Sequence, residues 1–242
     1  MSNFAILDKK KHGDLSIITE RGAAYGDNIM HSMTFALEFR DVQSCYPIFF
    51  CKDQETGAFY PTALLGFENE QNLFLTDSGW DAPYIPLTVR RQPFLIGFQP
   101  SPELGEGEKK PVVSIDMDNQ RINTEKGEKL FDDDGEPSGF LQTTVKMLEN
   151  IHRGLEHNKG FVAALLKHEL LESFTLEITL NDGSKNQLQG FYTIAEEQLH
   201  KLDGTALGEL HANGYLQPIF MAVASFARVR TLIDKKNALL DV

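Results

Sequence analysis

The first half of the chain is organised as short apolar runs separated by turn residues, a pattern that predicts the strands of a half-buried β-sheet. The runs at 46–52 and 60–67 lie on either side of a turn with the sequence KDQETG, so we expect them to form a hairpin. Phenylalanine is concentrated in this half, and aromatic side chains pack well on the pleated surface of a sheet. The expected strands are residues 15–19, 33–39, 46–52, 60–67, 72–75, 94–98 and 112–115.

Beyond residue 137 the spacing of apolar residues changes to steps of three and four, which is typical of an amphipathic helix. Ser138 suits the N-cap position of this helix, because its hydroxyl can accept a hydrogen bond from a free backbone N–H group of the first turn. We expect a second helix to begin near Asn158. The positions that carry the first pattern are Leu141, Val145, Leu148, Ile151 and Leu155.

The remainder of the second half predicts a hairpin followed by helices. Residues 174–180 alternate strictly between apolar and polar, and the turn Asn-Asp-Gly-Ser joins them to a second run at 188–194. The helices are expected at residues 194–202, 205–211 and 216–232. Because strands precede helices, the predicted fold class is α+β, with an antiparallel β-rich N-terminal part (1–136) and a helix-hairpin-helix C-terminal part (137–242). The two parts are either separate domains or one continuous domain.

The charge of the chain narrows its possible partners. It carries 35 acidic and 23 basic residues, a formal net charge of -12. A field of this sign repels phosphate groups, so we expect no nucleic-acid partner. We also expect no membrane insertion, since no run reaches the roughly 18 apolar residues of a membrane helix. Near the N-terminus an apolar patch precedes Lys9, Lys10 and Lys11, the reverse of the order in a signal peptide, which predicts a cytoplasmic protein.

The two cysteines, Cys45 and Cys51, lie in one predicted strand. Six steps along a strand separate two side chains by roughly 20 Å, which is beyond the reach of a disulfide bond. We therefore expect two reduced thiols in a reducing compartment, each packed as a small apolar side chain.

Candidate metal chemistry is limited to scattered residues. His12, Gly13 and Asp14 form an H-x-D triplet, which is part of the facial triad of non-haem iron enzymes. We interpret His12 as a solvated turn histidine. In the alternative, His12, Glu38, Asp116 and a later histidine converge as the site of a metal-dependent oxygenase or peptide-modifying enzyme. The chain has no P-loop, no G-x-G-x-x-G and no G-x-S-x-G, and we expect neither catalysis nor a cofactor.

The most distinctive segment is 80–94, which contains the single Trp of the chain together with Tyr, Pro and Arg. Trp80, Tyr84, Arg90 and Arg91 combine aromatic faces with guanidinium groups. Such a set binds carboxylates, peptides or flat ligands, and these residue types are enriched at protein interfaces. We therefore predict a binding site there. In the alternative, the two aromatic residues cap the sheet and the two arginines neutralise nearby acids.

Several segments together resemble the SapC-like bacterial proteins. They are YPIFF at 46–50, PTALLGF followed by NLFL, the pattern W-x-A-x-Y-x-P-x-x-x-R-R-x-P-F at 80–94, and FDDDGEPS at 131–138. The resemblance extends from about His12 to the C-terminal helix. The family name comes from an association with bacterial surface layers, which implies a surface-layer-associated structural protein as a further alternative. The resemblance implies no established catalytic or binding residues.

From these features we predict an accessory or binding protein without catalysis of its own. Its expected partner is a peptide, a protein or a small anionic ligand, held by the 80–94 segment. The metal-dependent enzyme and the surface-layer protein are the two alternatives.

Overall fold

A five-stranded antiparallel sheet forms the larger half of the molecule. In the computed structural model, which describes residues 3–101, 103, 105, 107 and 109–240, its strand order is β12-β13-β4-β5-β3. The strands are β3 (His31–Met33), β4 (Ile48–Lys52), β5 (Phe59–Leu64), β12 (Leu171–Thr179) and β13 (Lys185–Ile194). The β4–β5 and β12–β13 hairpins are both confirmed, and so is the α+β fold class.

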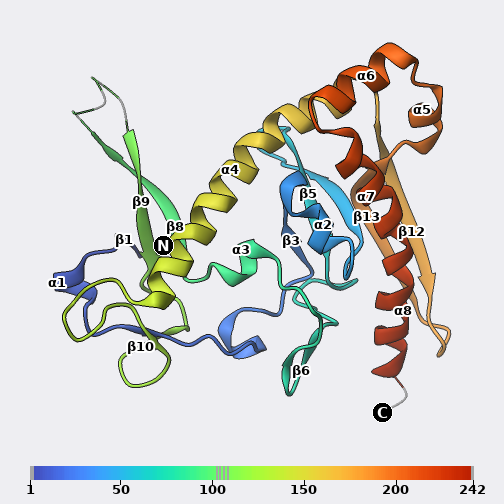
Figure 1. Cartoon of the computed structure of the whole chain (residues 1–242). Helices are drawn as coiled ribbons and strands as arrows, with labels where there is room; N and C mark the ends of the chain where they lie inside the picture. Colours follow the sequence, from blue (N-terminus) through green and yellow to red (C-terminus); the bar gives the residue numbers. More distant parts are fainter. Residues whose placement is uncertain (1–2, 102, 104, 106, 108, 241–242) are drawn as a thin grey trace.

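The two hairpins meet where β13 pairs with β4, so strands from both halves of the chain share one sheet (Figure 1). Phe191 lies opposite Cys51, and Tyr192 lies opposite Phe50. The division of the chain at residue 136 stays a prediction.

A second, three-stranded sheet has the order β1-β9-β8. Its strands are β1 (Phe4–Ile6), β8 (Phe94–Pro100) and β9 (Lys109–Asp116), and a small neighbouring ladder joins β10 (Ile122–Asn123), β2 (Ser16–Ile17) and β11 (Glu128–Lys129). Apolar side chains from this region form a smaller core, separate from that of the five-stranded sheet. Its buried members are Ile17, Phe94, Ile115, Leu130 and Leu148.

One helix, α4 (Gly139–Lys167), runs from the smaller core to the larger one (Figure 1). Ser138 caps it as predicted, since its Oγ accepts from the Leu141 N–H at 3.2 Å. The prediction of a second helix near Asn158 is wrong, because the helix continues through that residue. The Asn158 side chain is buried and binds the backbone of another segment, accepting from the Ala36 N–H and donating to the Thr34 carbonyl.

Two expected strands are largely absent. Residues 33–39 extend only to Met33 as a strand and then form a 3-10 turn, η2 (Ala36–Glu38), and a short helix, α2 (Phe39–Val42). Burial of Phe35, Phe39 and Val42 follows a helical step, which outweighs the loose alternation of this stretch. Of 72–75, only Leu75 is in a strand, β6 (Leu75–Thr76), which pairs with β7 (Gly79–Trp80).

Helices cover the five-stranded sheet at the C-terminal end of the chain. They are α5 (Glu196–Lys201), α6 (Gly204–Ala212), α7 (Leu216–Ser225), the 3-10 turn η3 (Phe226–Arg228) and α8 (Val229–Ala238). By length and composition alone, Leu216–Ala238 is long and apolar enough to cross a membrane, which the sequence analysis did not anticipate. Ile219, Ala222 and Leu232 of this segment are buried against the larger core.

Candidate functional site

The two aromatic residues of the 80–94 segment turn their polar atoms toward the interior. Trp80 Nε1 donates to Tyr46 Oη at 2.7 Å, and the Tyr46 hydroxyl donates to the carbonyl of Tyr84. The Tyr84 hydroxyl donates to Glu38 Oε1 at 2.8 Å. These bonds connect the segment to η2 and to the residues before β4. The polar side-chain groups of Trp80 and Tyr84 therefore form hydrogen bonds within the protein.

Glu38 is the acceptor at the centre of this network. Its side chain also accepts from the Thr34 hydroxyl at 2.6 Å and from the Leu87 N–H at 2.7 Å, and the residue is 3% exposed. Burial raises the pKa of Glu38, while these hydrogen bonds act in the opposite direction. Burial, together with the neighbouring Glu38, raises the pKa of Tyr84. We call Glu38 with its partners Thr34, Tyr84 and the Leu87 N–H the Glu38 network.

The two predicted arginines differ in their surroundings. Arg90 ends the short helix α3 (Leu87–Arg90) and is exposed. Arg91 is half-buried, its Nη1 donates to the Phe94 carbonyl at 2.6 Å, and burial lowers its pKa. Of the four predicted binding residues, Arg91 borders the cavities described next, whereas Trp80, Tyr84 and Arg90 do not line them.

The largest apolar hollow lies where α4 crosses the sheet β1-β9-β8. Its cavity of about 660 Å³ is lined by β1, β9, the segment before α4 and the first turns of α4. Most of the lining is apolar and four residues are polar. The lining residues are Ile6, Leu7, Lys9, Val112, Val113, Phe131, Pro137, Leu141, Gln142, Val145, Lys146 and Glu149.

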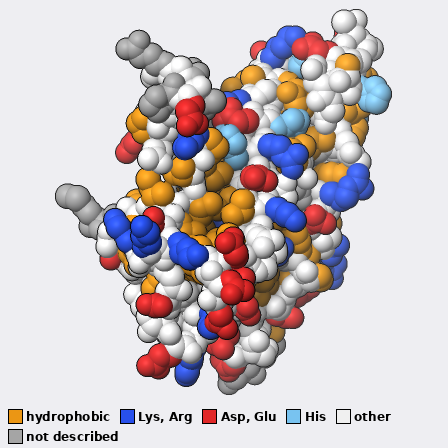
Figure 2. Space-filling view, turned by 60° about the vertical axis from the view of Figure 1, so that its left-hand side comes forward, with side chains coloured by type: hydrophobic (Ala, Val, Ile, Leu, Met, Phe, Trp, Pro, Cys, Tyr) orange, Lys and Arg blue, Asp and Glu red, His pale blue; other side chains and the backbone are white. Residues whose placement is uncertain are grey.

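Two smaller cavities continue this hollow across α4. A middle cavity of about 120 Å³ shares Val113, Val145 and Glu149 with the large one. A third of about 330 Å³, bordered by Arg91, shares Ile96 and Leu148 with the middle one. We name these three neighbouring cavities, which share lining residues, the α4 groove. Figure 2 shows apolar side chains gathered on the surface, with Lys, Arg, Asp and Glu side chains around them.

The alternation of the β8–β9 hairpin explains why the groove exists. Phe94, Ile96 and Phe98 share one face of β8, and this face is turned toward α4. Phe94 is 1% exposed, Ile96 is half-buried and Phe98 is 54% exposed, because the hairpin diverges from α4 toward its tip (Figure 1). The helix therefore covers the base of the apolar face and leaves the outer part open.

The residues of the proposed metal alternative do not come together. Among the described residues, no group of three or more His, Cys, Asp or Glu side chains is placed to hold a metal ion. The prediction of a solvated His12 is wrong, because the residue is 5% exposed and its Nδ1 accepts from the Asp8 N–H at 2.9 Å. Glu38 belongs to the network described above, and Asp116 ends β9.

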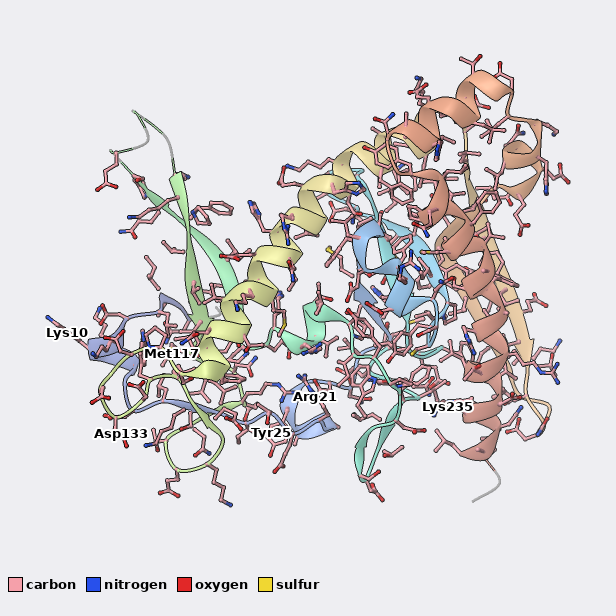
Figure 3. All side chains as sticks on the ribbon, in the orientation of Figure 1. Lys10, Arg21, Tyr25, Met117, Asp133 and Lys235 are labelled. Carbon is pink, nitrogen blue, oxygen red and sulfur yellow. The ribbon has the colours of Figure 1, made fainter. Side chains whose placement is uncertain are left out.

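A buried ion pair also lies outside what the sequence predicted. Arg121 Nη2 donates to both carboxylate oxygens of Asp27, at 2.7 and 2.6 Å, and both residues are fully buried. Arg21 Nη1 lies 3.3 Å from Asp27 Oδ1, and the Arg121 guanidinium sits over the ring of Tyr25. Arg21 and Tyr25 extend from the segment beneath α3 in Figure 3. This ion pair joins the β10 region to the segment before β3.

A polar cavity of about 660 Å³ on the five-stranded sheet is bordered by His31, Cys51 and Tyr60. Both cysteines are buried and free. Burial raises the pKa of the Cys51 thiol to about 11, so this thiol is protonated at neutral pH and is not an activated nucleophile.

A family model described as SapC matches residues 7–232, in agreement with the resemblance of the sequence motifs. The matched range includes both cores and the whole of α4. No curated protein and no solved structure matches the chain.

Proposed function

The chain belongs to the SapC family, and we propose that it acts as a non-catalytic accessory protein that binds an apolar ligand in the α4 groove. The observation that carries this proposal is the large apolar cavity between β9 and α4. Its volume of about 660 Å³ falls in the range of small-molecule sites, which are mainly apolar and contain a few polar groups. The sequence-based prediction that the 80–94 segment holds a peptide, a protein or a small anionic ligand stays a prediction.

The exposure of apolar side chains around the groove supports a binding role. Phe4 is 59% exposed, Ile6 48% and Phe98 54%. Contiguous apolar surface is costly to hydrate, and such patches mark interaction sites in many proteins. A ligand with an apolar body would remove this surface from water.

The Glu38 network supports the non-catalytic part of the proposal. Glu38 and Tyr84 have strongly perturbed environments, which is a common mark of catalytic groups. Here Tyr84 donates to Glu38, Glu38 also accepts from the Leu87 N–H, and neither residue lines the α4 groove. The raised pKa values of Glu38 and Tyr84 therefore belong to residues whose hydrogen bonds hold the 80–87 segment in place.

The proposal is tested by calorimetric titration of the whole protein with decan-1-ol, an uncharged probe with a flexible apolar chain. We expect wild-type protein to bind the probe and Val145→Asn, in the groove, to weaken binding about tenfold, the cost of losing one to two buried methyl contacts. The matched control is Leu166→Asn, which changes an exposed apolar residue near the other end of the same helix. Failure of the wild type to bind, or equal binding by Val145→Asn, contradicts the proposal.

A further inference from the structure

We propose that the ligand of the α4 groove is a slender aliphatic chain with one anionic head group, held with its head between Lys9 and Lys146. This inference rests on the proposed function and adds the chemical class and the orientation of the ligand. Three features of the groove support it: the relative volumes of its three cavities, the positions of its charged residues and the side chains that line its far end.

The shape of the groove favours a narrow, flexible occupant. A cavity of about 120 Å³ lies between cavities of about 660 and 330 Å³ and shares lining residues with both. Ile96, Val113 and Leu148 line this narrow part. A single hydrocarbon chain can lie through such a constriction, whereas a rigid ring system would be confined to the wide end.

Charge is distributed unevenly along the groove. Lys9 and Lys146 both line the wide cavity and are exposed, in a chain whose net charge is -12. Lys9 Nζ makes one long hydrogen bond, 3.4 Å, to the Asp134 carbonyl. Within the described part of the chain, Lys146 Nζ forms no side-chain hydrogen bond and no ion pair, unlike Lys159 on the same helix. Two ammonium groups at the wide end are therefore available to an anion.

One acid opposes them, and its position sets the direction of the ligand. Glu149 lines both the wide and the middle cavities, whereas Lys9 and Lys146 line the wide cavity and not the middle one. An anionic head is repelled from Glu149 and attracted to the two lysines. The head group is therefore directed to the outer part of the wide cavity and the tail to the constriction.

The far end of the groove suits the tail. One arginine, Arg91, borders the third cavity, compared with the two lysines that line the wide one, and its Nη1 donates to the Phe94 carbonyl at 2.6 Å. Phe98 and His152 lie edge to face there, with ring centroids 6.0 Å apart. Phe98, Leu95 and Met33 add apolar lining to this end. An aliphatic tail can cover these side chains.

The experiment compares three ligands with the same ten-carbon chain by isothermal titration calorimetry of the whole protein: decanoate, decyl phosphate and decan-1-ol. We expect at least one of the two anions to bind about fivefold more tightly than the alcohol, the scale of exposed ion pairs. The tighter of the two identifies the head group as carboxylate or phosphate. This preference should decrease as salt is added, because the lysines are exposed.

Charge variants assign the preference to its site. Lys146→Gln should reduce the ratio of the affinity for the anion to the affinity for decan-1-ol, and its far-ultraviolet circular dichroism spectrum shows whether the variant is folded. Lys159→Gln is the matched control, since Lys159 is exposed on the same helix and pairs with Glu156. Equal affinity of wild-type protein for the alcohol and both anions overturns the head-group inference and leaves the proposed function intact. Absence of binding by all three ligands overturns both.

Discussion

Among single residues, the buried Glu38 makes the free energy of unfolding depend on pH. Its carboxyl is nearly inaccessible to water, and burial raises its pKa above the ordinary value of 4.5. Above pH 4.5 the unfolded chain loses the Glu38 proton before the folded protein does. The folded state then binds more protons than the unfolded state, so the Glu38 contribution to the free energy of unfolding decreases as the pH rises through the raised pKa.

Replacing Glu38 with Gln should remove this dependence. Between pH 4.5 and 7, the free energy of unfolding of Glu38→Gln is expected to rise relative to that of the wild type as the pH increases. Urea denaturation at a series of pH values measures the difference. The control is Glu172→Gln, at an exposed position, which should run parallel to the wild type. A Glu38→Gln curve that is also parallel would contradict a raised pKa.

The Asp27–Arg121 pair should be among the most sensitive positions in the chain. Asp27→Asn removes the partner of a guanidinium whose side chain is 1% exposed. Breaking such a pair on one side costs about 3–5 kcal/mol, because an uncompensated charge stays buried. Denaturant unfolding of Asp27→Asn, Arg121→Met and the double variant forms a cycle. We expect the double variant to lose less than the sum of the two single losses, and simple additivity would argue against direct coupling.

The chemistry of these residues was only partly accessible from the sequence. The segment from Trp80 to Phe94 is recognisable by composition, yet the direction in which Trp80 and Tyr84 point depends on Tyr46 and Glu38, which are distant in the chain. The partners Asp27 and Arg121 are 94 residues apart, and no local pattern links them. Contacts of this kind arise from tertiary packing. The spacing of apolar residues along a single sequence does not reveal them.

At the scale of elements, a close contact with a neighbouring side chain determines whether replacing a helical glycine with alanine stabilises or destabilises the protein. Gly154 lies inside α4, where Ala is normally more favourable than Gly by about 1 kcal/mol. A Cβ at Gly154 would lie 2.2 Å from the ring of Phe35, whereas one at Gly208 in α6 would meet nothing within 4 Å. We expect Gly154→Ala to lower the thermal midpoint and Gly208→Ala to raise it. Stabilisation by Gly154→Ala would show that the ring of Phe35 moves aside at little cost.

Elements determined by local pattern were the most predictable. Each of the hairpins β4–β5 and β12–β13 has two runs and a turn that are adjacent in the sequence, so local residues fix both the strands and their pairing. Residues 33–39 were mispredicted as a strand because Phe35 and Phe39, with Val42 beyond them, are buried at helical spacing rather than on a pleated face. The helix α4 continues through Asn158, whose side chain binds a backbone segment that is distant in the sequence.

For the whole molecule, α4 is the physical link between two apolar cores. Leu148 belongs to the smaller core, and Phe161 and Leu165 belong to the larger core. The sequence predicted the first part of this helical face, Leu141 to Leu155, but assigned the residues from Asn158 onward to a second helix. It did not predict that the face serves two cores in succession, nor that β13 pairs with β4, because both depend on the arrangement of sheets that are distant in the chain. The α4 groove is a consequence of the same arrangement.

Because α4 joins the two cores, we expect a substitution that destabilises the smaller core to destabilise the larger core as well. Leu148→Ala deletes a side chain that is 2% exposed and should cost about 2–5 kcal/mol. Trp80 packs against the larger core, so its fluorescence reports on unfolding there. If α4 couples the cores, Leu148→Ala lowers the urea midpoint of Trp80 fluorescence as much as that of far-ultraviolet circular dichroism. Leu165→Ala, in the larger core, is the matched control and should shift both midpoints as well. If Leu148→Ala leaves the urea midpoint of Trp80 fluorescence unchanged, the two cores unfold independently. In that case α4 does not join them into one cooperative unit.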